Sequence, residues 1–120
     1  MNEIREIIES AWENRELLKQ EQTISTIREV INLLDKGELR VAEPTANGWQ
    51  VNEWIKKAVV LYFPIQKMET IEAGPLEFHD KIPLKTGYAE KGIRVVPHAV
   101  ARHGAYLSKG TILMPSYVNI

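Results

Sequence analysis

Arg94-Val-Val-Pro-His-Ala-Val100-Ala-Arg-His-Gly-Ala-Tyr106-Leu-Ser-Lys-Gly-Thr-Ile112-Leu-Met-Pro-Ser-Tyr-Val118-Asn-Ile120 is the stretch that decides the fold, because it repeats every six residues. Bulky apolar residues share one phase of the repeat: Val100, Tyr106, Ile112 and Val118. Small residues stand four places later in each hexad: Gly104, Gly110 and Ser116. This pattern is typical of a hexapeptide β-helix, in which each hexad forms a short strand and a tight turn. We therefore expect the bulky phase to point into the prism and the small phase to form its corners.

The repeat reaches Ile120 in the middle of a coil. A coil buries its apolar face only by stacking on its neighbours, so a single coil is not stable by itself. We therefore expect the chain to be the front part of a longer protein, with its β-helix truncated.

The composition is that of an ordinary globular protein of 120 residues, enough for one domain or for a small domain and the start of another. Fifteen Lys and Arg against sixteen Asp and Glu argue against a nucleic-acid partner, because such proteins carry a basic excess. The absence of cysteine excludes disulfides, thiolate nucleophiles and Cys-ligated metals, and it agrees with a cytoplasmic location. No apolar run approaches the roughly 18 residues of a membrane span.

Three amphipathic helices are predicted before the repeat, over residues 3–18, 24–35 and 53–62. Thr23 is the predicted N-cap of the second helix and Asn52 that of the third, through their side-chain oxygens. Gly37 suits the end of the second helix, and Pro64 is expected to terminate the third. The first two helices should form an antiparallel pair, and Lys56-Lys57 should lie on a solvated face.

The segments between these helices and the repeat are less regular. A hairpin is predicted from Leu39–Ala42 to Trp49–Val51 around Asn47-Gly48, with a loop longer than two residues. A strand over Met68–Ile71 is possible within 65–92, which otherwise is interpreted as an irregular connector. The predicted domains are residues 1–90, helical with a small hairpin, and residues 91–120, the first coils of the β-helix.

Few residues suggest chemistry by themselves. His79-Asp80 resembles a base with its orienting carboxylate, but adjacent side chains seldom point the right way for this. His98 and His103 match no familiar metal spacing and are expected at the surface. No catalytic residue, metal ligand or permanently bound cofactor is predicted. Arg94 stands at the bulky apolar phase of the hexad, so it is either a substrate clamp that binds a carboxylate or an ordinary edge residue.

Several segments closely resemble one family, the tetrahydrodipicolinate N-succinyltransferases of bacterial lysine (diaminopimelate) biosynthesis. They are Leu33–Glu43, Trp54–Leu61, Phe78–Lys85, Gly92–Pro97, Ala99–Tyr106 and Leu113–Ile120, in collinear order. The segment Leu-Met-Pro-Ser-Tyr-Val-Asn-Ile is specific among hexapeptide transferases, where generic hexads are not.

The resemblance implies an α+β chain, with a helical amino-terminal domain followed by the start of a left-handed parallel β-helix. It implies a cytoplasmic homotrimer, with active sites between neighbouring β-helices. The implied reaction is transfer of succinyl from the co-substrate succinyl-CoA to L-2-amino-6-oxopimelate, the ring-opened dicarboxylate. Arg94 matches the family arginine of Gly-x-Arg-Val-Val-Pro that binds this dicarboxylate.

The family's acidic catalytic residue and its CoA-binding coils are expected beyond Ile120, so these 120 residues alone should be catalytically inactive. His98 replaces a residue that is usually small or proline in the family. Two alternatives remain open. In the first alternative, the chain is a non-catalytic domain that associates with trimers or other partners. In the second, it is part of another hexapeptide-repeat acyltransferase.

Overall fold

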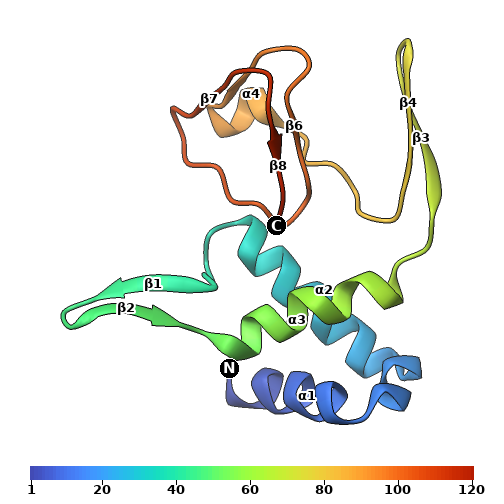
Figure 1. The fold of residues 1–120 in the computed structure, drawn as a ribbon, viewed down its shortest axis with the longest axis vertical. Helices are drawn as coiled ribbons and strands as arrows, with labels where there is room; N and C mark the ends of the chain where they lie inside the picture. Colours follow the sequence, from blue (N-terminus) through green and yellow to red (C-terminus); the bar gives the residue numbers. More distant parts are fainter. The chain divides into compact units, whose positions relative to one another are not determined.

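A computed structural model describes all 120 residues, which form two compact units, Met1–Ile65 and Gln66–Ile120 (Figure 1). Each unit has its own buried residues. The predicted boundary between domains, near residue 90, lies within the second unit. That the β-helix repeat begins there stays a prediction. No helix in either unit reaches the length and apolar content that crossing a bilayer requires.

The first unit is a bundle of three helices with a hairpin inserted before the last helix (Figure 1). This confirms the predicted helical amino-terminal domain. Its elements are α1 (Asn2–Glu13), the 3-10 helix η1 (Arg15–Lys19), α2 (Glu21–Asp35), β1 (Ala42–Thr45), β2 (Gly48–Val51) and α3 (Glu53–Ile65).

The first predicted helix is interrupted at Asn14, so the continuous helix expected over 3–18 is wrong. Asn14 has an extended backbone, with φ −134° and ψ 97°, and its side-chain oxygen accepts a hydrogen bond from the N–H of Glu16 at 3.2 Å. An asparagine that caps a following turn favours such a break. The chain therefore leaves α1 and begins η1 one residue later.

The second helix starts three residues earlier than predicted. The carbonyl of Gln20 already accepts from the N–H of Ile24 at 3.0 Å, which places Thr23 inside the first turn, buried, and not at the N-cap. The predicted end at Gly37 is confirmed. Gly37 has φ 76° and donates to the Leu34 carbonyl, while Glu38 donates to that of Leu33. These two bonds form a Schellman motif, which requires the left-handed glycine.

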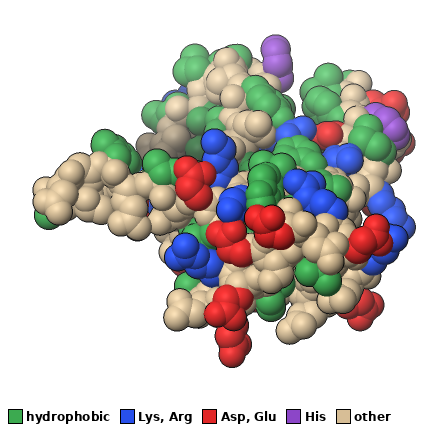
Figure 2. Space-filling model, turned by 60° about the horizontal axis from the view of Figure 1, so that its bottom comes forward, with side chains coloured by type: hydrophobic (Ala, Val, Ile, Leu, Met, Phe, Trp, Pro, Cys, Tyr) green, Lys and Arg blue, Asp and Glu red, His purple; other side chains and the backbone are tan.

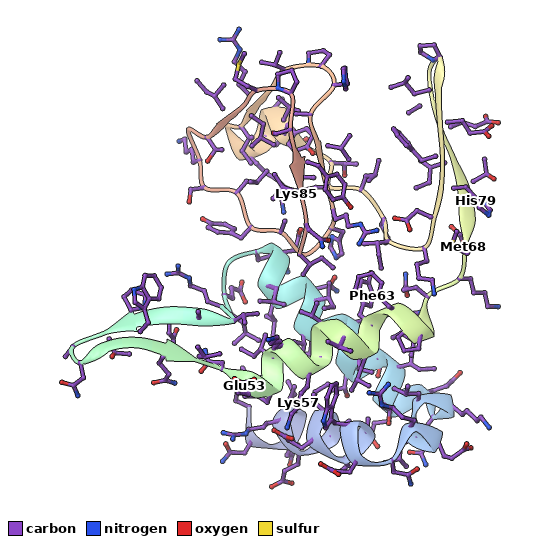
Figure 3. The ribbon with its side chains drawn as sticks, in the orientation of Figure 1. Glu53, Lys57, Phe63, Met68, His79 and Lys85 are labelled. Atoms are coloured by element: carbon purple, nitrogen blue, oxygen red, sulfur yellow. The ribbon has the colours of Figure 1, made fainter.

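Apolar stripes on all three helices meet in one core. The buried members are Ile8, Ala11, Ile27, Val30, Ile31, Leu34, Trp54, Ile55, Ala58, Leu61 and Tyr62. At its edge, the Lys57 ammonium on α3 binds Glu9 on α1 at 2.8 Å and lies 5.8 Å from the Trp12 ring centroid (Figure 3). The expectation that both lysines are solvated is therefore wrong for Lys57, which joins two helices.

The predicted hairpin forms, with a different first strand and a shorter loop. Ala42 pairs with Val51 and Thr45 with Gly48, so Ala46-Asn47 is a two-residue loop, shorter than expected. The Thr45 hydroxyl donates to the Gly48 carbonyl at 2.7 Å, which closes this turn. The first strand therefore begins at Ala42, where the prediction ended it.

Asn52 and Pro64 mark the two ends of α3, each differently from the prediction. The Asn52 backbone carbonyl accepts from Ile55, while its side chain donates to the Arg40 carbonyl and accepts from Gln50. The side chain thus anchors the hairpin to the helix start. Pro64 lies inside the last turn, and the helix continues to Ile65, because a proline restricts the residue before it without excluding a final helical turn.

The second unit begins with a regular hairpin where an irregular connector was expected. Strands β3 (Glu69–Ala73) and β4 (Leu76–Asp80) pair antiparallel, and Gly74-Pro75 forms the loop. Gly74 has φ 62°, a conformation that glycine adopts at little cost. A short helix α4 (Tyr88–Lys91) follows, bounded by Gly87 and Gly92. The possible strand over Met68–Ile71 overlaps β3, but β4 and its pairing with β3 were not predicted.

Four two-residue strands follow α4: β5 (Arg94–Val95), β6 (Val100–Ala101), β7 (Ile112–Leu113) and β8 (Tyr117–Val118). They pair in parallel, β5 with β7 and β6 with β8. Arg94 lies opposite Ile112, eighteen positions or three hexads further along the chain. The first ladder is thus spaced by three hexads, whereas in the second Val100 lies opposite Tyr117, seventeen positions further along, so these 120 residues hold two short parallel ladders and no extended β-helix.

In the hexads of Arg94, Val100, Tyr106 and Ile112 the burial phase is shifted by one residue from the prediction, whereas Val118 is half-buried and Asn119 is exposed. Tyr106 and Ile112 are 54% and 57% exposed, whereas Ala101 is fully buried and Leu113 is 9% exposed. Successive residues of a strand face opposite sides, so a shift of one exchanges interior and surface. The hexads contain adjacent apolar pairs, such as Ile112-Leu113. The repeat therefore predicts the spacing correctly but does not determine which member of each pair faces inward.

Candidate functional site

Arg94 lies on the outer side of the short ladders. It belongs to the phase that includes the exposed Tyr106 and Ile112, while Val95, the next residue of β5, is half-buried. Its backbone N–H donates to the Thr111 carbonyl at 3.0 Å, which fixes the strand on which the side chain stands. The guanidinium is therefore accessible, as a substrate clamp requires. An ordinary edge residue would be exposed as well, so both alternatives offered by the sequence agree with this position.

The backbone preceding Arg94 is fixed by a close contact at Gly92. The Gly92 carbonyl accepts from the N–H of Gly110 at 2.8 Å, and Gly92 has φ 69°. A Cβ atom built there would lie 2.9 Å from Cγ of Lys109, so the lysine stem covers the glycine directly. Only glycine permits both this conformation and this approach. The start of β5, and with it Arg94, is held by this contact.

This part of the chain carries a net positive charge because it contains no acidic residue. Residues 91–120 contain four of the fifteen Lys and Arg residues, Lys91, Arg94, Arg102 and Lys109, and none of the sixteen Asp and Glu residues. Charge asymmetry of this kind indicates an anionic partner or ligand. The net charge of the whole chain, −1, does not show this asymmetry. The net charge of residues 91–120 taken separately does.

The three histidines do not come together. His79 on β4 (Figure 3) lies opposite Thr70, with Nδ1 3.3 Å from the threonine hydroxyl. Side chains alternate along a strand, so Asp80 faces the other side. His79 and Asp80 therefore do not form a base and its orienter. His98 is exposed, and His103 is half-buried with its backbone N–H donating to the Pro83 carbonyl at 2.8 Å. No three His, Cys, Asp or Glu side chains gather as metal ligands do.

Asp80 instead belongs to a structural network around Arg102. Nη2 of Arg102 lies 2.9 Å from Oδ2 of Asp80, and Nη1 lies 3.2 Å from Oδ1 of Asn119. The guanidinium also stands over the Tyr117 ring, 5.8 Å from its centroid. The N–H of Lys81, and then the Arg102 charge, hold the pKa of the Asp80 carboxyl below its usual range, although burial opposes this. This arginine ties β4 to β6 and β8 and is engaged within the fold.

The first unit offers no comparable site. Its helices carry acidic and basic side chains interspersed over the visible surface (Figure 2). A shallow depression between α1 and α2 is lined by Glu3 and Glu6 together with Ile7, Ser10, Leu17, Gln20 and Gln22. The charged residues that line this depression are both carboxylates, so it does not suit an anionic ligand.

Fold and charge together define the class of this protein: a three-helix amino-terminal domain joined to a cationic unit of short parallel strands. Residues 3–65 match the family described as tetrahydrodipicolinate N-succinyltransferase, N-terminal. This match covers more than half of the chain and ends where the first compact unit ends. The chain belongs to the tetrahydrodipicolinate N-succinyltransferase family, as its sequence segments predicted.

Curated relatives extend the similarity over all of the chain. The 2,3,4,5-tetrahydropyridine-2,6-dicarboxylate N-succinyltransferase of Legionella pneumophila (strain Paris) is 46% identical over 130 aligned residues that cover 100% of this chain. The enzymes of the same name from Azoarcus sp. (strain BH72) and Pseudoalteromonas translucida (strain TAC 125) are 47% and 40% identical, again over 100% of this chain. The chain spans about half the length of these relatives, 47%, 48% and 47% respectively.

Proposed function

We propose that the protein to which these residues belong is an N-succinyltransferase of the diaminopimelate route to lysine. Succinyl-CoA is the co-substrate, and the acceptor is tetrahydrodipicolinate in its ring-opened form, L-2-amino-6-oxopimelate. The acceptor amine attacks the thioester carbonyl, an amide bond forms as the carbon–sulfur bond breaks, and CoA leaves as the thiol. The observation that carries this proposal is the similarity of the entire chain to relatives of that name.

Arg94 is the proposed ligand of the dicarboxylate. Its exposure on a strand fixed by Gly92 supports this role, because a carboxylate can approach the guanidinium without displacing the fold. A guanidinium binds a carboxylate through two parallel N–H···O bonds, which gives orientation as well as affinity. The surrounding segment contains no carboxylate of its own to compete for the arginine.

The ladders are proposed to be the start of a left-handed parallel β-helix, with residues 91–120 as its first coils after a domain of residues 1–90. The eighteen-residue offset between Arg94 and Ile112 supports this, since three hexads make one coil. The proposed assembly is a cytoplasmic homotrimer. Four large apolar side chains are exposed within residues 94–120: Tyr106, Ile112, Met114 and Tyr117. Exposed apolar side chains support association with another chain.

A coupled assay of CoA release tests the proposed reaction. The whole protein encoded by the reading frame should release CoA from succinyl-CoA only when L-2-amino-6-oxopimelate is present. The 120-residue segment by itself should release none, because it corresponds to 47% of a relative's length. The native mass of the whole protein, measured alongside, should be three times that of one chain. Release that does not depend on the dicarboxylate would contradict the proposal.

A further inference from the structure

Lys109 lies against Gly92, two residues before Arg94, and both cationic residues are exposed. Its stem runs along Gly92, and Cε stands 3.5 Å from the position of a Cβ at that glycine. Gly92 precedes Arg94 by two residues, and the intervening Ile93 is only 6% exposed. Gly92, Arg94 and Lys109 are all exposed, whereas Ile93 is buried, so the lysine stem and the guanidinium both reach solvent at the start of β5.

Neither cation is neutralised within the structure. Lys19, Lys57 and Arg102 each bind a carboxylate, whereas Arg94 and Lys109 have no carboxylate partner. The neighbouring Lys91 differs, because its ammonium donates to the Thr86 carbonyl at 2.6 Å. Two exposed and uncompensated cations near the start of β5 form an attractive site for an anion with two negative ends.

We propose that Lys109 is a second substrate-binding residue, which binds one carboxylate of the diacid acceptor while Arg94 binds the other. This inference rests on the proposed function, since that reaction requires a diacid. The two residues divide the task by their chemistry: the guanidinium fork orients one carboxylate, and the ammonium is a point charge on a flexible stem. Gly92, under the lysine stem, and Arg94 are two residues apart, so at most about 7 Å separates their Cα atoms, of the same order as the roughly 7 Å span of a seven-carbon diacid.

The phosphates of succinyl-CoA carry the same kind of charge, so the test must separate the two substrates. Pimelate and heptanoate are suitable probes, because both have seven carbons and they differ by one carboxylate. The whole protein, its Lys109→Met variant and a Lys67→Met control are titrated with each probe. Lys67 is an exposed lysine of the same unit that lies outside the ladders, so its replacement removes an equal charge.

Lys109→Met should weaken pimelate binding about 10-fold or more, as expected for a lost charge-assisted hydrogen bond. Heptanoate, oriented by Arg94 alone, should bind with little change, and Lys67→Met should alter neither affinity. Equal weakening of both probes, or of neither, overturns the inference. Thermal unfolding of each variant confirms that the compared proteins are folded.

Steady-state kinetics separate this inference from the proposed function. Lys109→Met should raise KM for L-2-amino-6-oxopimelate and leave KM for succinyl-CoA unchanged, whereas a raised KM for succinyl-CoA assigns the lysine to the phosphates and overturns the inference. If the whole protein releases no CoA but Lys109→Met still weakens pimelate selectively, the reaction is wrong and the diacid site stands. If CoA is released and the lysine variant behaves as wild type, the site is wrong and the reaction stands.

Discussion

Arg102 and Asp80 form an ion pair across 22 positions of the chain, with Nη2 2.9 Å from Oδ2. The arginine side chain is 16% exposed and the aspartate side chain 33% exposed, so solvent partly screens the pair. The same guanidinium binds Asn119 beyond the second ladder. One side chain therefore connects the β3–β4 hairpin to the parallel strands and stabilises the arrangement of the second unit.

Replacing Asp80 by Asn should lower stability in a pH-dependent way. Because the pKa of Asp80 is lower in the folded protein than its unfolded value of about 3.9, its contribution is present above roughly pH 5. It is lost as pH falls through the folded-state pKa. Urea unfolding should show a loss of about 1 kcal/mol at pH 7 and a clearly smaller loss near pH 2.5. An equal loss at both pH values contradicts the assignment.

A matched control for Asp80 lies on the same strand. Glu77 stands directly opposite Glu72, and like charges opposite each other destabilise a strand pair. Glu77→Gln should therefore leave the free energy of unfolding unchanged at pH 7 or raise it by up to about 1 kcal/mol.

Replacing Gly92 by Ala should both destabilise the second unit and disturb the diacid site. The left-handed conformation costs an alanine about 1 kcal/mol, and its Cβ would lie 2.9 Å from Cγ of Lys109. Since the lysine stem is flexible, it should move aside, and KM for the dicarboxylate should rise several-fold. Gly74→Ala is the control, because Gly74 also has a left-handed backbone, with φ 62°, but a Cβ there would have no atom within 4 Å. This variant should lose stability through the backbone conformation alone and leave KM unchanged. Identical kinetics for the two variants would rule out the contact.

Replacing Arg94 should affect the diacid substrate and hardly affect the fold. Arg94→Met removes an exposed side chain, so the free energy of unfolding should change by less than about 0.5 kcal/mol. KM for L-2-amino-6-oxopimelate should rise roughly 10- to 100-fold, with KM for succinyl-CoA unchanged. Arg94→Lys keeps the charge but loses the fork, so its KM should be intermediate. An unaltered KM for the dicarboxylate in Arg94→Met rejects the role.

Replacing Ile31 by Ala should strongly destabilise the helical unit. Ile31 is fully buried where the three helices meet, and truncation of such a residue removes apolar contacts and leaves a cavity. Chemical denaturation should show a loss of about 2–5 kcal/mol. Val60→Ala on α3, at a site that is 43% exposed, should cost less than about 1 kcal/mol. Similar losses for the two variants would place Ile31 outside the core.

The sequence predicted the elements whose causes are local. Apolar stripes at helical spacing predicted three helices, and Gly37 predicted the end of α2, because a Schellman motif depends on one residue's backbone conformation. The break at Asn14 and the start of α2 before Thr23 were missed, since both depend on competition between neighbouring turns. A strand overlapping β3 was predicted, but β4 was missed, because strand pairing depends on contacts across a turn and a five-residue segment indicates it only weakly.

For the candidate site, sequence alone identified Arg94, the hexad spacing and the family, because each of these is a pattern along the chain. Tertiary structure decided which side of the strand the arginine occupies. In adjacent apolar pairs such as Ile112-Leu113, only packing selects the residue that enters the interior. It also brought Lys109 onto Gly92, seventeen positions away in sequence, through the parallel register of the ladders. Periodicity determines the spacing of a repeat, whereas the choice of its buried face depends on contacts between residues that are distant in the chain.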